Sequence, residues 1–554
     1  MHRISFPRRK PLVKVLVGFA GALVAATAAQ AAPPAGNLIG VYHFGSSAAV
    51  TDLTGTASVN AVSGRGEMLL ANDGNLYVAQ SAGGAASAGA VMRVAPNGTT
   101  VVVHAFKGDT TEAALPYAGL IQANDGKLYG TSYAGGVNSA GAVYSVGLDG
   151  TYATVFAFDA KNKGGYRPYG GLVQGPDGAL YGTTLQGGTA NTGTLFRVTL
   201  AGVHTELLSF TGANGANPEG HLVVGADGAL YGTTMTGGTH DRGTVFKITT
   251  GGTYTLLYSF DSINSFNAVG DGTNASGANP RTGLRVGPDG NLYGTAYQGG
   301  SAGYGTLFRV TPAGALTVLH TFGGTPSDGS RPLGAVSVMP DGTLYGTTSL
   351  GGSGNGGTAW RLSAGGAWSV LHAFSGSAQA IVTSPLSAID GTTPYVGLVP
   401  LNGFLYGMTY TDVSTSAGNV FKIDLGTAGT LPITFSVSPE TVTLGSSAVI
   451  SWSSPGAASC TASENWTDTI ATSGTVTVTP TSAGIYNYAI GCTDGAGVTR
   501  FARAFLSVAT AAAKPVDGGA TSGGGGGAID LFSLLLLGGA AGVAARRRLR
   551  SLSL

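Results

Sequence analysis

Charged side chains are scarce in this sequence: 10% of its 554 residues are Asp, Glu, Lys or Arg, against about 25% in an average soluble protein. Residues 1–31 and 528–554 hold nine of the 28 basic residues and one of the 27 acidic ones, so the rest of the chain carries a net charge of about −7. This balance argues against a nucleic-acid partner, which would require a basic surface. The 43% of hydrophobic residues argue against a disordered chain.

Motifs of catalysis and metal binding are missing as well. The sequence has no nucleophile elbow, no HExxH zinc motif and no phosphate-binding loop. It therefore predicts no catalytic residue, no cofactor and no metal site. Glycine is in excess, with 94 residues, which favours many short strands joined by tight turns.

One phrase organises most of the chain. Its cleanest copy, Asp227 to Thr249, reads Asp-Gly-Ala-Leu-Tyr-Gly-Thr-Thr, then a Gly-Gly pair, then Gly-Thr-Val-Phe-Lys-Ile-Thr. A period of 50 to 62 residues predicts a repeat architecture. The Leu-Tyr step recurs at Tyr77, Tyr129, Tyr181, Tyr231, Tyr293, Tyr345 and Tyr406.

Each repeat unit contains four segments with strand character, separated by turn residues. Four antiparallel strands in about 50 residues are typical of a propeller blade, so the sequence predicts a seven-bladed β-propeller over residues 37–426. We interpret the Gly after each Tyr as a site of close backbone packing. In the third unit the expected strands are Gly171–Val173, Leu180–Thr184, Thr194–Thr199 and Glu206–Phe210.

The seventh unit lacks a good copy of the fourth strand after Val420–Ile423. An orphan copy, Ile39–Phe44, stands at the start of the array, and we expect it to complete the last blade and close the ring. The rival segment Leu431–Phe435 contains Pro432 and is interpreted as the start of the next domain.

Most polar residues of the array have a structural interpretation. His104, His320 and His372 share a register with Phe and Leu in other units, which indicates a packing position. The Asp before each turn Gly is expected to bond its own backbone. His221 and His240 lie off this register and stay open. The off-register carboxylates that could serve a glycosidase are Glu67, Glu112, Glu206 and Glu219.

Two insertions, Asp261 to Asn279 and Ser375 to Pro394, lengthen the array. Long loops on a rigid scaffold often carry binding, although tolerated surface insertions are the alternative.

From residue 431 to 510 the period vanishes and alternating strands predict an Ig-like β-sandwich, with Trp452 and Tyr486 in its core. Cys460 and Cys492 are the only cysteines, and in an exported chain they are expected to form a disulfide. The alternative is a pair of free thiols with a redox or metal role, for which no His lies nearby.

The first 31 residues have the features of an export signal. A basic head precedes the apolar run Val15–Ala28, and Ala29-Gln30-Ala31 predicts cleavage by signal peptidase between Ala31 and Ala32. The alternative is an uncleaved membrane anchor, for which the apolar run is short.

The C-terminal end has a flexible Gly-rich linker, residues 511–527, and a tripartite tail, residues 528–550. The apolar run Ile529–Ala545 predicts a short transmembrane helix. Glycines precede it and arginines follow it: Gly523, Gly524, Gly525, Gly526, Gly527, Arg546, Arg547 and Arg548.

Three resemblances follow from these residues. The phrase from Gly64 to Asp424 resembles the GloVer-type tandem repeat of exported bacterial choice-of-anchor proteins, with departures at Val78–Gln80, Thr358–Trp360 and Asn402–Phe404. The segment with Trp452 and the cysteines resembles bacterial Ig-like repeats, which implies a stalk. The tail resembles a GlyGly-CTERM signal, which implies cleavage by rhombosortase, a rhomboid-type sorting protease; a permanent membrane anchor is the alternative.

The sequence thus predicts an exported cell-surface or secreted protein that acts as a binding or structural module. Its extracellular ligand, a glycan or a protein, is not indicated. The alternative is a secreted carbohydrate-active enzyme, a hydrolase or lyase, with its site at the propeller mouth. Converging, unrepeated acidic or His side chains at the mouth would favour the enzyme.

Overall fold

The computed structural model describes residues 38–43, 50–53, 57–58, 66–84, 86–96, 98–162, 164–266, 272–323, 328–375, 391–401, 403–411, 418–425, 433–466, 468–482, 484–494 and 499–509. The fold is all-β, with one 3-10 turn, η1 (Ala160–Asn162), and no sheet closes on itself within these ranges. No helix in the described ranges is long and apolar enough to cross a membrane. The predicted signal peptide with Ala31 and Ala32, the linker 511–527 and the tail with Gly523–Gly527 and Arg546–Arg548 lie outside the described residues.

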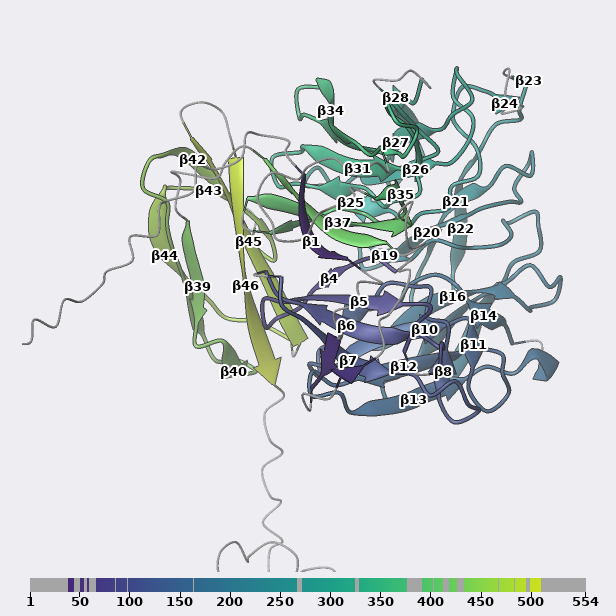
Figure 1. The fold of residues 1–554 in the computed structure, drawn as a ribbon, viewed down its shortest axis with the longest axis horizontal. Helices are drawn as coiled ribbons and strands as arrows, with labels where there is room; N and C mark the ends of the chain where they lie inside the picture. The colour runs from purple at the N-terminus through teal and green to yellow at the C-terminus, as the bar shows by residue number, and fades with distance from the viewer. Residues whose placement is uncertain are drawn as a thin grey trace, which may run out of the picture. The chain divides into compact units, whose positions relative to one another are not determined.

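Seven sheets follow one plan, in which a two- or three-residue strand begins the sheet and three longer antiparallel strands follow (Figure 1). We number these units 1 to 7 along the chain. Their strands are β4 (Leu69–Leu70), β5 (Leu76–Gln80), β6 (Ala90–Val94) and β7 (Thr100–Ala105) in unit 1; β9 (Ile121–Gln122), β10 (Leu128–Ser132), β12 (Ala142–Val146) and β13 (Tyr152–Ala157) in unit 2; β15 (Val173–Gln174), β16 (Leu180–Gln186), β17 (Thr194–Val198) and β18 (His204–Ser209) in unit 3; β19 (Val223–Val224), β20 (Leu230–Thr234), β21 (Thr244–Ile248) and β22 (Tyr254–Ser259) in unit 4; β25 (Arg285–Val286), β26 (Leu292–Ala296), β27 (Thr306–Val310) and β28 (Leu316–Thr321) in unit 5; β30 (Ser337–Val338), β31 (Leu344–Thr348), β33 (Thr358–Leu362) and β34 (Trp368–Ala373) in unit 6; and β36 (Val399–Leu401), β37 (Phe404–Thr411), β38 (Asn419–Asp424) and β1 (Leu38–His43) in unit 7.

The N-terminal strand supplies the fourth strand of unit 7, as predicted. β1 pairs antiparallel with β38, with Leu38 opposite Ile423 and His43 opposite Asn419. The rival segment belongs elsewhere, because β39 (Thr434–Ser438) pairs with β41 (Ala448–Ser453) in another sheet. The seventh repeat is thus completed by residues about 380 positions upstream of β38.

Short strands extend or bridge the units. β2 (Val50–Asp52) runs parallel to β7 and pairs with β3 (Ala57–Ser58). β14 (Tyr166–Pro168) pairs with β16 of unit 3, and β35 (Thr392–Pro394) pairs with β37 of unit 7. Three two-stranded ribbons complete the array: β8 (Ala113–Ala114) with β11 (Ala134–Gly135), β23 (Ser265–Phe266) with β24 (Gly272–Thr273), and β29 (Gly329–Ser330) with β32 (Leu350–Gly351). The ribbon β23–β24 lies in the first predicted insertion; residues 376–390 of the second lie outside the described residues.

Buried hydrophobic side chains connect each unit to the next. One cluster joins unit 1 to unit 2, and further clusters join each successive pair up to units 6 and 7. A last cluster packs Val78 and Val94 of unit 1 against Tyr406 and Val420 of unit 7. The series of contacts therefore returns to its starting point, and units 4 and 5 are the units farthest from unit 1 along it.

In units 2 to 7 the glycine after the repeat Tyr accommodates an aromatic ring, which corrects the predicted backbone packing. Gly182 pairs across the ladder with Phe196, and Gly232 with Phe246. A Cβ at Gly232 would lie 2.6 Å from Cζ of Phe246. The buried neighbour is therefore a side chain of the next strand, which the Cβ of any other residue would displace.

The threonine after this glycine bonds the next unit. The buried Thr131 hydroxyl donates to the Gly170 carbonyl at 3.0 Å, and Thr233 donates to the Thr282 carbonyl at 2.9 Å. Both acceptors lie three residues before a first strand. The repeated Thr thus satisfies a backbone group at the junction of two sheets, where an unpaired carbonyl would be unfavourable.

The repeated Asp residues make turns, as predicted. Asp227 accepts a hydrogen bond from the Ala229 backbone at 3.1 Å, and its other oxygen accepts from Tyr231 Oη at 2.9 Å. Lys247 Nζ lies 2.7 Å from the same oxygen. The carboxylate is therefore occupied by its own turn and by the Tyr four residues on.

The C-terminal module consists of two sheets around one hydrophobic core. The strand order is β39-β41-β44 (Ser473–Val478) in one sheet and β40 (Thr441–Thr443)-β46 (Thr499–Ala509)-β45 (Gly484–Asp494)-β42 (Ala457–Glu464)-β43 (Asp468–Ile470) in the other.

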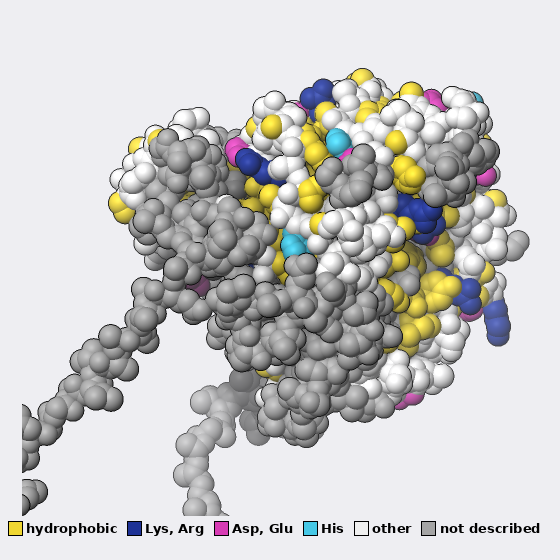
Figure 2. Space-filling view, turned by 45° about the horizontal axis from the view of Figure 1, so that its top comes forward, with side chains coloured by type: hydrophobic (Ala, Val, Ile, Leu, Met, Phe, Trp, Pro, Cys, Tyr) yellow, Lys and Arg dark blue, Asp and Glu magenta, His cyan; other side chains and the backbone are white. Residues whose placement is uncertain are grey.

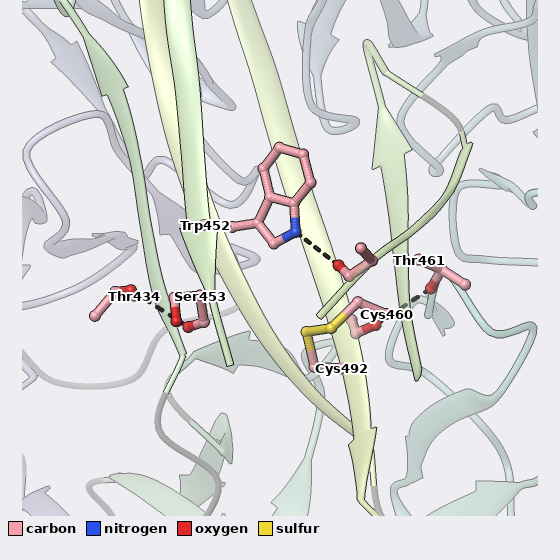
Figure 3. The surroundings of a disulfide bond; sticks show 8 residues. Thr434, Trp452, Ser453, Cys460, Thr461 and Cys492 are labelled. Carbon is pink, nitrogen blue, oxygen red and sulfur yellow. Dashed lines mark hydrogen bonds between the residues drawn. A yellow bond between two sulfur atoms is a disulfide. The ribbon is translucent and has the colours of Figure 1, made fainter. Parts of the chain in front are cut away.

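Cys460 and Cys492 form the predicted disulfide (Figure 3). They lie opposite each other on β42 and β45, so the bond joins neighbouring strands of one sheet, unlike the inter-sheet bond of antibody domains. Trp452 is buried, and its Nε1 donates to the Ala471 carbonyl at 2.8 Å. Tyr486 is only partly buried, and the fully buried tyrosine of this core is Tyr488.

The low charge of the sequence is visible on the surface. Figure 2 shows Lys, Arg, Asp and Glu side chains scattered among uncharged ones on the visible face. Glu67, His221 and Arg285 form a partly buried cluster, which belongs to the candidate site described next.

Candidate functional site

The segment before each first strand follows a common register, in which units 2 to 7 place a Pro five residues before the strand and unit 1 places Gly64; we number the positions from the residue after this one. In Figure 1 the first strands β4, β19 and β25 lie toward the middle of the array. The first position holds Tyr117, Tyr169, Glu219, Arg281, Leu333 and Tyr395 in units 2 to 7. The third position holds Glu67, Gly119, Gly171, His221, Gly283, Ala335 and Gly397 in units 1 to 7. The fifth holds Leu69, Ile121, Val173, Val223, Arg285, Ser337 and Val399.

Side chains of the first position converge on a cavity of about 180 Å³, which we call the mouth cavity. It is lined by residues from all seven units, so residues up to 328 positions apart, Glu67 and Tyr395, meet in one space. Its aromatic and charged lining residues include Tyr117, Tyr169, Glu219, Arg281, Tyr297 and Tyr395.

Three residues from the third and fifth positions meet below this cavity and form what we call the crossbar. Arg285 of unit 5 donates to the carboxylate of Glu67 of unit 1 and also contacts the imidazole of His221 of unit 4. His221 Nδ1 lies 3.6 Å from Glu67 Oε1. Since units 4 and 5 are farthest from unit 1, the crossbar spans the array from one side to the other.

Glycines at the third position leave room for the crossbar. A Cβ at Gly283 would coincide with the His221 ring, and one at Gly171 would lie 3.3 Å from His221 Cβ. A Cβ at Gly119 would lie 3.1 Å from Cβ of Glu67. The units without a functional side chain at this position thus accommodate the two that carry one.

A second cavity, of about 280 Å³, lies against the crossbar. It shares Glu67, Gly119, Gly171 and His221 with the mouth cavity and adds Arg285. Its other walls are apolar side chains from the first residue of each of four first strands and from the residue before it: Met68, Leu69, Leu120, Ile121, Leu172, Val173, Leu222 and Val223. The crossbar therefore stands between a polar cavity and an apolar one.

The protonation states of the crossbar follow from its charges. Burial opposes ionisation of Glu67, but attraction to Arg285 and His221 and the hydrogen bond from Arg285 outweigh it and hold its pKa below the usual range. Burial, followed by the positive charge of Arg285, lowers the pKa of His221 to about 4. At neutral pH the crossbar thus contains a carboxylate, a guanidinium and a neutral imidazole.

This lowered pKa predicts a pH dependence of stability. Because the folded pKa of His221 lies below the ordinary value of about 6.5, the unfolded chain binds a proton more readily between the two values. The stabilising effect of neutral His221 is complete above about pH 6.5 and decreases by about 2–3 kcal/mol as the pH falls to 4. Urea unfolding across this range should show the decrease, and His221→Gln should remove it.

The matched control is His240→Gln, since His240 is exposed. This variant should keep the wild-type pH profile. An identical profile for His221→Gln and the wild type would contradict the assigned imidazole pKa. The contribution of the Glu67 carboxylate enters only at the acid end of this window, because its lowered pKa makes that contribution fall as the pH drops through about 4.3.

The mouth cavity has two different sides. The rings of Tyr117 and Tyr169 lie 5.5 Å apart and tilted by 31°. On the other side the Arg281 guanidinium lies over the Tyr297 ring at 4.8 Å, and its Nε lies 3.9 Å from Glu219 Oε2. At the first position, units 7, 2 and 3 contribute a tyrosine to the cavity, and units 4 and 5 contribute a charged side chain. Unit 7 adjoins unit 1 in the series of contacts, so the three tyrosines come from one side of the series.

The other predicted candidates do not join this site. His104 stacks on Tyr152 at 4.7 Å, and His320 stacks on Trp368 at 3.5 Å, which agrees with a packing position. Both also face a carboxylate, His104 with Glu112 at 3.0 Å and His320 with Asp328 at 3.2 Å. The described residues contain no group of three or more His, Cys, Asp or Glu that could hold a metal ion.

Two more candidates are placed as follows. Glu206 accepts a hydrogen bond from Ser209 Oγ at 2.7 Å on the fourth strand of unit 3. His240 is exposed and lies away from the cavities described above. Of the six off-register candidates, the structure brings together three: Glu67, Glu219 and His221.

Sequence reasoning missed the arginines and tyrosines of the site. Arg281 and Arg285 are two of the few charged residues at positions where other units place apolar or aromatic ones. This departure from the register can be recognised in the sequence. The contact between Glu67 and Arg285, which are 218 residues apart, cannot be predicted from it.

The fold and site define a class: an all-β repeat protein whose units differ where they face one another. The Gloeobacter/Verrucomicrobia repeat model matches residues 63–278 and 266–464, which is more than half of the chain. The chain belongs to this repeat family, and the resemblance inferred from the repeated phrase is confirmed. No curated protein sequence matches it.

Solved structures match this chain at low identity and low TM-score. An extracellular domain described as part of a one-component system from B. thetaiotaomicron is 11% identical, with a TM-score of 0.41 over 85% of this chain and 59% of that one. One from a hybrid two-component system of B. thetaiotaomicron is 11% identical, with a TM-score of 0.44 over 86% and 58%. The chain thus spans about three fifths of these domains, and the likeness indicates no ligand.

Proposed function

We propose that this chain is an exported glycan-binding protein whose mouth cavity holds the ligand. Units 1 to 7 are the blades of a seven-bladed β-propeller that β1 closes, over residues 37–426. The Ig-like sandwich, residues 431–510, serves as a stalk. The observation that carries the proposal is the convergence of non-repeated polar and aromatic side chains on one cavity.

The composition of the cavity supports a sugar ligand. Tyrosines offer ring faces that can cover the apolar C–H face of a sugar and a hydroxyl that can bond its edge. Glu219 accepts hydrogen bonds and Arg281 donates them, which suits the hydroxyl groups of a carbohydrate. A protein partner would need a much larger surface than this cavity offers, about 800 Å² on each side.

Removal of either tyrosine of the aromatic wall should weaken binding. Tyr117→Ala and Tyr169→Ala are each expected to weaken glycan binding at least tenfold, because each removes a contact face from the cavity. A glycan array followed by titration calorimetry measures this. Tyr117→Phe, which keeps the ring, and Tyr258→Ala, on the distant fourth strand of unit 4, should bind within about threefold of the wild type.

A glycan-active enzyme is the second candidate, because Glu67 and His221 converge without a repeated counterpart. A hydrolase would need a carboxyl with a raised pKa as general acid, whereas the pKa of Glu67 is lowered. A lyase fits better, since a neutral imidazole beside a guanidinium can accept a proton. Incubation with polysaccharides tests it; product formation that His221→Gln abolishes would establish the enzyme.

Processing at both ends completes the proposal. Signal peptidase would cleave between Ala31 and Ala32, and the sorting protease would remove the helix that follows Gly523–Gly527. Mass spectrometry of the mature protein should find a C-terminus within or near these glycines. An intact Leu554 would instead support a permanent anchor, with the propeller outside the membrane.

A further inference from the structure

We infer that the mouth cavity takes the end of a glycan chain, one uncharged terminal sugar inserted end-on, rather than the middle of a chain. This inference rests on the proposed glycan binding and names the part of the ligand that is recognised. Three observations carry it: the crossbar, the size of the cavity and the arrangement of its two sides.

The crossbar prevents a chain from threading through the array. Glu67 from unit 1 reaches Arg285 and His221 from units 5 and 4, so the three side chains cross the space between the first strands. Opening it would break the ion pair between Glu67 and Arg285 and the contact of Arg285 with His221, all of them between partly buried side chains. The mouth cavity therefore has a floor.

The floor lies at a shallow depth. The mouth cavity measures about 180 Å³, whereas pockets for drug-sized ligands measure about 300–1,000 Å³. A single sugar ring fits a cavity of this size, and a second ring would have to remain outside. Beyond the floor the second cavity is walled mainly by Leu, Ile, Val and Met, which offer nothing to hydroxyl groups.

The two sides orient the sugar. Tyr117 and Tyr169 present tilted rings next to each other, which suits the apolar face of a ring. Opposite, Arg281 is exposed and held over Tyr297, with Glu219 beside it. A sugar between them places one face on the tyrosines and its hydroxyl edge on a donor and an acceptor.

The charges favour an uncharged sugar. Each guanidinium of the site has a carboxylate beside it, Arg281 with Glu219 and Arg285 with Glu67. A ligand carboxylate would approach these acidic groups and a ligand amine would approach the arginines. Hydroxyl groups, which donate and accept, can bond both Arg281 and Glu219.

The test uses the full chain and a ladder of neutral oligosaccharides of one to six sugars, taken from the best class on the array. End-on binding predicts affinities that agree within about threefold from two to six sugars, with one protein per chain end. Removal or chemical capping of the terminal sugar should weaken binding at least tenfold. Glu219→Gln and Arg281→Gln should each weaken it, while Tyr258→Ala should not.

The outcomes separate the two proposals. Affinity that rises tenfold or more with chain length, or several proteins bound along one capped chain, would overturn end-on recognition and leave glycan binding intact. Preference for acidic over neutral sugars would overturn the assigned charge class. No binding to any glycan would overturn the proposed function itself.

Discussion

Removal of β1 is expected to unfold or aggregate the protein at temperatures where the full chain is stable. β1 pairs along its length with β38, and Leu38 is buried with Phe421 and Leu405 in the cluster between units 6 and 7. Loss of one buried leucine costs about 2–5 kcal/mol. Each lost backbone hydrogen bond adds about 0.5–1.5 kcal/mol. The total is comparable to the whole stability of a typical domain, about 5–15 kcal/mol.

The measurement is thermal unfolding by circular dichroism, with size-exclusion chromatography for aggregation. A synthetic peptide of residues 38–43, added in excess, should restore part of the lost stability by strand addition to β38. A truncated chain with an unchanged melting temperature would show that unit 7 is complete without β1. An exposed edge strand is also an aggregation site, so oligomers should form in the truncated chain alone.

The role of β1 could be predicted because a repeat shows what is missing. Seven copies fix the number of strands expected in each unit, and Val420–Ile423 had no successor. Pattern matching between Ile39–Phe44 and strands such as Leu316–Thr321 then supplied the partner. The pairing of β1 with β38 confirms that reasoning, which required no side-chain detail.

Other features could be predicted only in part. The position of the glycine after Tyr was evident from the repeats, but its partner was not, because a strand sequence does not state which ring lies across the ladder. Cross-strand register, as in Gly232 opposite Phe246, decides it. The Asp turns were predictable because their hydrogen bonds span only two to four residues.

The candidate site shows the limit most clearly. Glu67, His221 and Glu219 were recognised as departures from the repeat, yet nothing local indicated that two of them meet. Their convergence depends on the ring of units, which brings the third position of unit 1 opposite that of unit 4. Arg285 was overlooked since a single Arg in a strand is usually a solvated side chain. Aligning the seven segments on their first strands recovers all four.

Truncation of the aromatic ring over a repeat glycine should have a large effect that the glycine position can partly reverse. Phe246 is fully buried and packs against Phe210, with ring centroids 5.5 Å apart. Phe246→Ala is therefore expected to cost about 3–5 kcal/mol. Gly232→Val should cost about 1–3 kcal/mol or more, because the added side chain meets the Phe246 ring.

The double variant distinguishes direct packing from a general loss of stability. With the ring removed, the valine at position 232 occupies part of the space, so the combined cost should fall short of the sum by about 0.5–3 kcal/mol. Urea unfolding of the wild type, both single variants and the double variant measures this coupling. Val203→Ala, at an exposed hairpin residue, is the control and should change stability by less than about 0.5 kcal/mol. Strictly additive effects would mean that the glycine is retained for its backbone and not for the ring.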